Sequence, residues 1–464
     1  MKGYTKIELT NVHTGEKEVV EKHNIITNNL VEMYKTYLLC TRQSAYFNNT
    51  DPLYQNGMGG IILFSNPLTE DVNKFGVSLD SVDDITGCAG NFVNNTGDKK
   101  LGSRNINESK NIENGYKYVW DFGTSQANGT ISAIGLTHNV ATISSNSAYA
   151  TPFVMEVFSA SYPASYIYCY GLGNYTFSNI VSYDFDNNTF VAVNLISNTE
   201  IKFTVYKVDT VTQHILPSTI MRPGSKKILK LSETTVNLPI EININSGNIL
   251  DGFDGYYYYV EHTNYSRLKL ARISKTNFKY DSEYGLKDTT YDSSFIYALS
   301  SNDISIYDRI ANGYLYIRVY SGSAHLHKIK LSDPTKYKDL TIPKYNSSYA
   351  NMASNGKCIY TSGNIIFPDD SIVHYSRNSL NDASNTNYYF ANTSTLGINA
   401  NTVILVSSDT TKFVIINTST SNANMDIGVG YFYNSLSTIN NLSSSVVKTA
   451  DKTMKITYTL TEGE

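Results

Sequence analysis

Four stretches in the middle of the chain decide the fold. They read DNNTFVAVNLISNTEIKFTVYKVD (186–209), DGYYYYVEHTNYSRLKLARIS (254–274), NGYLYIRVYSGSAHLHKIKLSD (312–333) and NTVILVSSDTTKFVIINTS (401–419). Each combines a tight turn, a strand rich in aromatic and β-branched residues, a short polar turn and a second strand. This order is typical of antiparallel β-sheets built from consecutive hairpins.

The turns that open these stretches, with one more at Gly356, form a degenerate repeat. Asn187, Gly255, Gly313, Gly356 and Asn401 lie roughly 43–68 residues apart. A four-stranded propeller blade takes about 40–50 residues. The spacing therefore predicts a β-propeller of five to seven blades, with a pair of β-sandwiches or a β-solenoid as the alternatives.

The composition also indicates a β-rich protein. The chain has 464 residues, including 38 Tyr, and 17% are charged, against about 25% in an average soluble protein. With 37 Lys and Arg against 41 Asp and Glu, the net charge is −4, so we do not expect nucleic-acid binding. The sequence has no apolar run long enough for a membrane-spanning helix and no apolar segment of a secretion signal at its start.

The two ends of the chain differ from the middle. Residues 3–24 predict a hairpin, and residues 27–42 predict the one amphipathic helix, with Leu30, Tyr34 and Tyr37 on its apolar face. Another hairpin is expected over 115–140, with Trp120 in its first strand, after a long surface loop over 87–114.

The last strand resembles the first in its alternation of apolar and polar residues. MKITYTLTE (454–462) and YTKIELTNV (4–12) share this pattern. We therefore expect a mainly β fold in which a small N-terminal β-rich domain with one helix is completed by the C-terminal strand, with the propeller-like domain inserted. The expected boundaries are 1–147 for the N-terminal attachment domain, 148–433 for the inserted domain and 434–464 for the returning strand.

Motifs of catalysis or cofactor binding are missing from the sequence. It has no glycine-rich nucleotide loop, no GxSxG and no HExxH. His325 and His327 alternate in one predicted strand and so share a face, but their segment offers no third metal ligand. We predict no catalytic residues, no metal and no cofactor, and hence not an enzyme.

Recognition is the chemistry that this composition favours. Tyr supplies rigid contact area, and Asn and Ser supply adaptable hydrogen bonds. In the run Tyr256–Tyr259, alternate side chains face opposite ways, so either one pair is exposed or both pairs pack between blades. The candidate receptor-binding residues are Tyr256, Tyr258, Tyr320, His325, His327 and Tyr375. The candidate residues for an attachment or oligomer interface, with packing inside one chain as the alternative, are Leu30, Tyr34, Tyr37 and Trp120.

Four phrases at the two ends carry a family resemblance. They are KGYTKIELTNVHTGEKEVVEKHNIITNNL (2–30), GGIILF (59–64), VWDFGTSQANGTISAIGLTH (119–138) and NLSSSVVKTADKTMKITYTLTE (441–462). They resemble, in this order, tail-fibre and baseplate-associated proteins of phages and phage-tail-like particles from Firmicutes. The resemblance covers about 160 residues and departs from the usual phrase at Ile25, Ile26 and Asn29.

The resemblance implies a virion component at the tail tip or baseplate. The terminal domain would attach to other tail proteins, and the inserted domain would face the host as part of a homo-oligomer, with a trimer favoured. We expect a receptor-binding protein that recognises a bacterial cell-surface glycan or surface protein without cleaving it. The alternatives are a structural baseplate protein and a depolymerase of surface polysaccharide.

Overall fold

The computed structural model describes the greater part of both ends and of the middle of the chain. The described residues are 1–28, 30, 59–73, 79–90, 93–94, 97–137, 167–169, 179–208, 228–244, 247–263, 266–292, 308–320, 324–342, 352–361, 364–374, 402–406, 412–418, 425–431 and 436–462. The predicted helix over 27–42 lies almost entirely outside them, as do both expected domain boundaries. No helix among these residues is long and apolar enough to cross a membrane.

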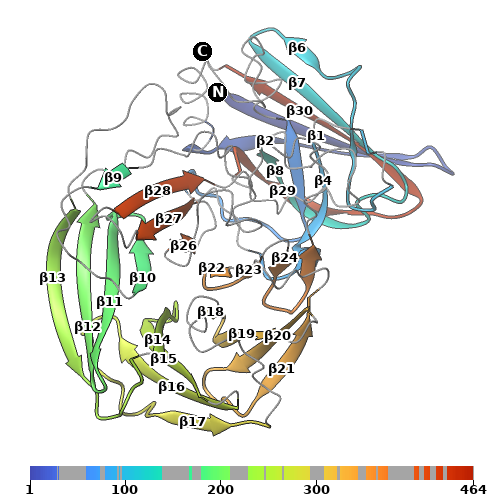
Figure 1. Cartoon of the computed structure of the whole chain (residues 1–464). Helices are drawn as coiled ribbons and strands as arrows, with labels where there is room; N and C mark the ends of the chain where they lie inside the picture. Colours follow the sequence, from blue (N-terminus) through green and yellow to red (C-terminus); the bar gives the residue numbers. More distant parts are fainter. Residues whose placement is uncertain are drawn as a thin grey trace.

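The two ends of the chain form one ten-stranded sheet (Figure 1). Its strands are β1 (Lys2–Asn11), β2 (Lys17–Ile26), β3 (Gly60–Phe64), β4 (Ile85–Ala89), β5 (Ser103–Arg104), β6 (Lys110–Ile112), β7 (Gly115–Phe122), β8 (Gly129–Thr137), β29 (Thr438–Lys448) and β30 (Lys452–Thr461). The expected surface loop over 87–114 is wrong in part, because β5 and β6 pair with β7 along the sheet edge.

The last strand returns to the first, as the alternation predicts. β1 and β30 pair antiparallel over ten residue pairs, from Lys2 opposite Thr461 to Asn11 opposite Lys452. Their alternate apolar side chains, including Ile7 and Ile456, are buried in one core. The chain therefore begins and ends side by side in this terminal sheet, and everything between β8 and β29 is an insertion.

Within the described residues, the inserted part forms five four-stranded antiparallel sheets, numbered here as blades 1 to 5. Blade 1 holds β10 (Asn179–Asp184), β11 (Thr189–Ser197), β12 (Glu200–Val208) and β13 (Ile228–Asn237); blade 2 holds β14 (Gly247–Asp251), β15 (Tyr256–Thr263), β16 (Arg267–Ser274) and β17 (Lys287–Thr290); blade 3 holds β18 (Arg309–Ala311), β19 (Tyr314–Tyr320), β20 (Ala324–Lys330) and β21 (Tyr337–Thr341); blade 4 holds β22 (Ala353–Ser354), β23 (Ile359–Thr361), β24 (Asn364–Ile366) and β25 (Ile372–His374); blade 5 holds β26 (Thr402–Val406), β27 (Lys412–Thr418), β28 (Met425–Tyr431) and β9 (Ile167–Cys169).

The five blades form a propeller-like ring (Figure 1). The first strands of the blades in chain order, β10, β14, β18, β22 and β26, contact one another in sequence, and β26 contacts β10. Blade 5 takes its fourth strand from the start of the insertion, because β9 pairs with β28. The expected fold class is confirmed, and the sandwich alternative is wrong.

Four of the five turn residues of the repeat, Asn187, Gly255, Gly313 and Gly356, lie between the first and second strands of blades 1 to 4. The fifth, Asn401, lies outside the described residues and precedes the first strand of blade 5, so there the repeat is out of step by one strand. The connection from β18 to β19 is an Asn-Gly pair with positive φ at both positions, 50° at Asn312 and 76° at Gly313. A two-residue turn of this kind matches the twist of a hairpin, and glycine adopts it without strain. Gly255 and Gly356, with φ of 92° and 86°, lie in the corresponding turns of blades 2 and 4.

Apolar side chains fill the spaces between neighbouring blades. Phe203 of blade 1 stacks on Tyr257 of blade 2, with ring centroids 5.4 Å apart. Leu268 of blade 2 and Ile329 of blade 3 belong to the next cluster, and Leu326 faces blade 4 in a third. Blades 2 and 3 are therefore apolar on both faces, which explains their dense aromatic strands.

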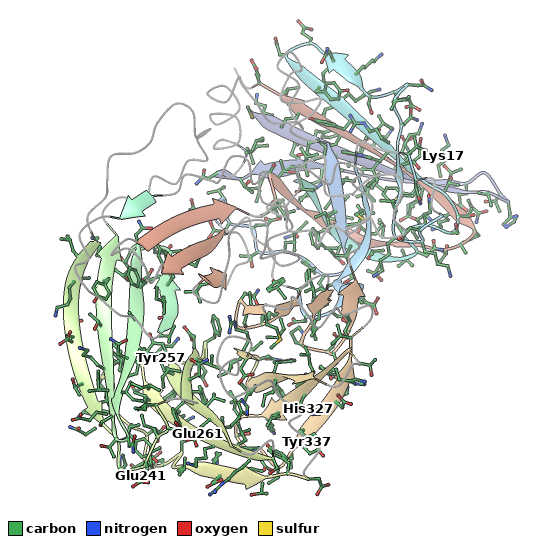
Figure 2. All side chains as sticks on the ribbon, viewed as in Figure 1. Lys17, Glu241, Tyr257, Glu261, His327 and Tyr337 are labelled. Atoms are coloured by element: carbon green, nitrogen blue, oxygen red, sulfur yellow. The ribbon has the colours of Figure 1, made fainter. Side chains whose placement is uncertain are left out.

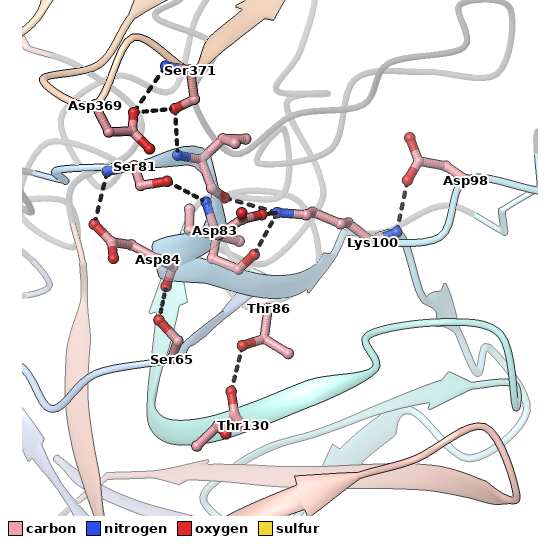
Figure 3. A network of polar contacts seen from close by, with 12 residues as sticks. Ser65, Ser81, Asp83, Asp84, Thr86, Asp98, Lys100, Thr130, Asp369 and Ser371 are labelled. Atoms are coloured by element: carbon pink, nitrogen blue, oxygen red, sulfur yellow. Dashed lines mark hydrogen bonds and ion pairs between the residues drawn. The ribbon is translucent and has the colours of Figure 1, made fainter.

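A short connector joins the terminal sheet to blade 4 (Figure 3). The 3-10 turn Val82–Asp84 precedes β4, and the backbone N–H of Val82 donates to Ser371 Oγ over 3.1 Å. Asp80 pairs with Lys357 Nζ at 2.8 Å. Lys100 Nζ donates to the carbonyl of Val82 over 2.8 Å and so holds the turn from the sheet side. These contacts fix one point of the ring against the sheet.

Candidate functional site

Two neighbouring strands of blade 3 bring together groups that can bind a ligand. β20 and β21 pair antiparallel, with His325 opposite Thr341 and His327 opposite Asp339. Because side chains alternate along a strand, His325, His327, Asp339 and Tyr337 all project to the face that blade 2 approaches. Figure 2 shows His327 and Tyr337 together on these strands. We call these four residues, with Tyr291 of blade 2, the rim cluster.

The carboxylate of the rim cluster faces two imidazoles. His325 Nδ1 lies 3.1 Å from Asp339 Oδ2, and His327 Nδ1 lies 3.8 Å from Asp339 Oδ1. The side chains of Asp339 and His325 are 50% and 28% exposed, whereas His327 is 10% exposed. The sequence predicts a shared face for the two histidines, which is confirmed, and the third group comes from the adjacent strand.

The contacts between the two imidazoles and the carboxylate are ion-pair contacts. Among the residues that the structure describes, no group of three His, Cys, Asp or Glu side chains is placed to hold a metal ion. Two cysteines, Cys88 and Cys358, are buried and free, and burial raises the pKa of each thiol to about 12. Thiolate chemistry at neutral pH is therefore not expected from them.

Tyr337 presents an aromatic ring beside the carboxylate. It is 50% exposed, and among the tyrosines whose side chains the structure describes it is the only exposed one. Its ring is nearly perpendicular to that of Tyr291, at 86°, and to that of His327, at 76°. The Tyr291 hydroxyl donates to the carbonyl of Pro334 over 2.7 Å. Edge contacts on the ring and this anchor before β21 hold Tyr337 in place.

The tyrosines that sequence reasoning favours lie elsewhere. Tyr258 is buried, its hydroxyl donates to Asp254 Oδ2 over 2.7 Å, and its pKa is raised by burial and by that carboxylate. The guanidinium of Arg272 covers the half-buried Tyr256 ring at 4.1 Å. Of the two interpretations of this run, packing of both pairs between blades is correct, because each face of β15 meets a neighbouring blade.

The remaining predicted residues divide into two groups. Trp120 and Leu30 are completely buried in the terminal sheet, and Trp120 Nε1 donates to the carbonyl of Gly59 over 3.1 Å. An exposed interface role for these two is wrong, and packing inside one chain is correct. Tyr320 closes β19, opposite Ala324. Tyr34, Tyr37 and Tyr375 lie outside the described residues.

A second imidazole–carboxylate pair lies deeper between blades 2 and 3. His262 Nε2 and Asp308 Oδ2 are 2.6 Å apart, and the two side chains are only 3% and 4% exposed. The neighbouring Arg309 has its pKa lowered to about 10 by burial. This pair is closed off from solvent, so a surface polymer cannot reach it in this conformation.

Sequence reasoning missed Tyr291, Tyr337 and Asp339. Tyr337 and Asp339 alternate in KYKDLT (336–341), which follows the turn SDPT (332–335) after the histidine strand. A hairpin alignment across that turn would have paired Asp339 with His327. The position of Tyr291 depends on how two blades pack, which no local pattern predicts.

Comparison with known proteins gives weak likenesses only. No family model and no curated protein match the sequence. Similar solved structures are apo AztD from Citrobacter koseri (9% identity, 58% of this chain and 59% of that chain, TM-score 0.22) and prolyl oligopeptidase B from Galerina marginata (10%, 91% and 53%, 0.28). A putative 6-phosphogluconolactonase from Bacteroides fragilis is also similar, with 10% identity over 86% of this chain and 84% of that chain and a TM-score of 0.23. The chain spans little more than half of the first two, and at these TM-scores the likenesses carry no argument.

Proposed function

We propose that this chain is a receptor-binding protein of a phage tail or phage-tail-like particle. It would recognise a bacterial cell-surface glycan or surface protein without cleaving it. The observation that carries the proposal is topological: the segments that resemble tail proteins lie at both ends of the sequence and fold into one sheet. That sheet suits attachment to the particle, and the inserted ring suits presentation to the host.

The rim cluster supports binding in preference to cleavage. Its open groups are an aromatic ring and one carboxylate, a combination that suits recognition through stacking and hydrogen bonds. Cleavage of a glycoside needs two carboxyl groups about 5–10 Å apart at an accessible site. The rim cluster contains one carboxyl group, and the His262–Asp308 pair is enclosed.

The proposal also covers the location of the protein in the particle and the proteins that it binds there. The protein would stand at the tail tip or baseplate, bound through the terminal sheet to other tail proteins, and would form a homotrimer. Several copies on one particle multiply a modest affinity, because binding of later copies is effectively intramolecular. The oligomeric state can be read from light scattering of the purified chain.

The test is a cell-binding assay with the full-length chain. The fluorescently labelled protein is mixed with candidate Gram-positive host cells, untreated, oxidised with periodate or treated with protease. Loss of binding after periodate alone identifies a glycan, and loss after protease alone identifies a surface protein. If the folded protein binds no cells but co-sediments with tail components, the structural baseplate function replaces this proposal. Release of soluble sugar from the cells would favour a depolymerase.

A further inference from the structure

We infer that the open part of the rim cluster, formed by Tyr337, Asp339 and His325, is the receptor contact, and that its ligand is an uncharged glycan with a pair of neighbouring hydroxyl groups. This inference rests on the proposed function and adds to it a location and a chemical class. Three observations carry it: the exposure and rigidity of one tyrosine, the partners of one carboxylate, and the charge of the surface that they form.

The tyrosine provides a preorganised stacking surface. Tyr337 is half exposed while its ring is held by Tyr291 and His327, whose centroids lie 5.7 and 6.1 Å away. A ring that is already fixed loses little conformational entropy when a ligand covers it. The CH-rich face of a pyranose is apolar and matches such a ring. The other tyrosines of blades 2 and 3 whose side chains the structure describes are buried or half-buried.

The carboxylate retains acceptor capacity for a ligand. Two acids of the ring have permanent cations beside them: Asp281 pairs with Arg272 at 2.7 Å, and Asp370 pairs with Lys338 at 2.7 Å and with Lys328. Asp339 has two imidazoles as its nearest basic groups, and half of its side chain is open. An ionised carboxylate only accepts hydrogen bonds and can accept two in parallel. Two adjacent sugar hydroxyls supply two such donors.

The charge of this surface selects the ligand class. A carboxylate at the centre disfavours glycans that carry phosphate or uronic acid groups beside it, since like charges placed together cost affinity. The lysine next in sequence, Lys338, lies on the opposite face of β21 and is paired with Asp370. Hence an uncharged hexose or N-acetylhexosamine polymer fits, and an anionic wall polymer does not.

The experiment compares variants of the full-length chain on cells and on two polysaccharide fractions. Cell-wall polysaccharide of a bound host strain is separated by anion exchange into a neutral and an anionic fraction, and each is immobilised. The variants are Tyr337→Ala and Asp339→Asn, and the matched control is Leu231→Ala, which changes a 54% exposed side chain on β13 of blade 1. Melting temperature and circular dichroism establish that each variant is folded.

The expected result is a preference for the neutral fraction and loss of binding at one site. Tyr337→Ala should weaken binding about tenfold or more, as removal of an aromatic anchor does, and Asp339→Asn should weaken it severalfold. Leu231→Ala should bind like the wild type. Prior oxidation of the neutral fraction with periodate, which cleaves vicinal diols, should abolish binding.

Two outcomes would contradict the inference, and they differ from each other. If the wild type binds cells but both folded rim variants bind equally well, or if the anionic fraction is preferred, the site is wrong and the proposed function stands. If the wild type binds neither cells nor either fraction, the proposed function itself is wrong, and the assignment of the rim cluster as receptor contact is wrong too.

Discussion

The terminal sheet and the ring use the same residue type in different ways. In the terminal sheet, Tyr118 and Tyr458 are fully buried, and Tyr118 lies parallel to Trp120 with centroids 5.7 Å apart. In the ring, the hydroxyls of Tyr284 and Tyr291 reach from blade 2 to backbone carbonyls of blade 3. Aromatic area therefore stabilises the sheet, whereas tyrosine in the ring also joins separate blades through its polar end.

This difference has a consequence for how each region tolerates change. A single continuous core makes the terminal sheet sensitive to lost volume, because cavities in a close-packed interior cost free energy. The ring distributes its apolar contacts over several smaller clusters, so a lost hydroxyl affects one blade interface. The following predictions test this contrast.

The largest effect is expected at Trp120. Trp120→Ala removes the largest buried side chain of the terminal sheet and leaves the carbonyl of Gly59 without its donor. The free energy of unfolding should fall by about 3–5 kcal/mol, measured by urea denaturation followed by circular dichroism. Trp120→Phe, which keeps most of the volume, should cost less. If the alanine variant is as stable as the wild type, the terminal sheet is not more sensitive to lost volume than the ring is.

A pH-dependent effect is expected at Lys448. Its ammonium is buried against Asn128 Oδ1, at 2.8 Å, and burial lowers its pKa to about 8. Between that value and the ordinary pKa of about 10.5, the unfolded chain binds more protons, so the free energy of unfolding should rise with pH by about 3 kcal/mol. Lys448→Met should lack this rise.

The check is a melting series from pH 7 to pH 10.5 for three proteins. These are the wild type, Lys448→Met and the control Lys452→Met, whose lysine keeps contact with solvent and with Glu18 at 3.2 Å. Wild type and control should change together. The same pH profile in all three would show that Lys448 does not carry the effect.

A smaller effect is expected at the tyrosines between blades. Tyr284→Phe and Tyr291→Phe keep the rings but remove hydroxyls that donate to the carbonyls of Leu331 and Pro334. Each should lower the free energy of unfolding by about 1–2 kcal/mol, because a partner is left unsatisfied. Hydrogen exchange should show faster exchange in blade 3 than in the terminal sheet. Unchanged exchange in blade 3 would mean that these hydroxyls do not join the blades.

The smallest effect is expected at the joint between the two regions. Asp80→Asn removes the ion pair with Lys357, in which the Asp80 side chain is 71% exposed. Exposed pairs contribute about 0–1 kcal/mol, so the melting temperature should change by no more than a degree or two at low salt and not at all at high salt. A large loss would indicate that the joint, and not either core, limits stability.

The sequence predicts the ring better than it predicts the candidate site. Turns such as Asn312-Gly313 are local features, and a conformation with positive φ follows from the two residues alone. The return of the last strand follows from matching alternation. The rim cluster, in contrast, depends on the register of β20 with β21 and on the approach of Tyr291 from another blade. Such contacts are set by tertiary packing.

The side-by-side position of the first and last strands has a mechanical consequence. Lys2 and Thr461 face each other at one end of β1 and β30, so a pull applied there runs along both strands at once. Hydrogen bonds of a sheet lie across the strand direction. A pull on both ends in the same direction therefore loads the β1–β2 and β30–β7 ladders in shear, whereas a pull that separates the two ends opens the β1–β30 ladder one bond after another. The chain enters and leaves the ring through the same sheet. A load on the terminal strands therefore does not stretch the ring.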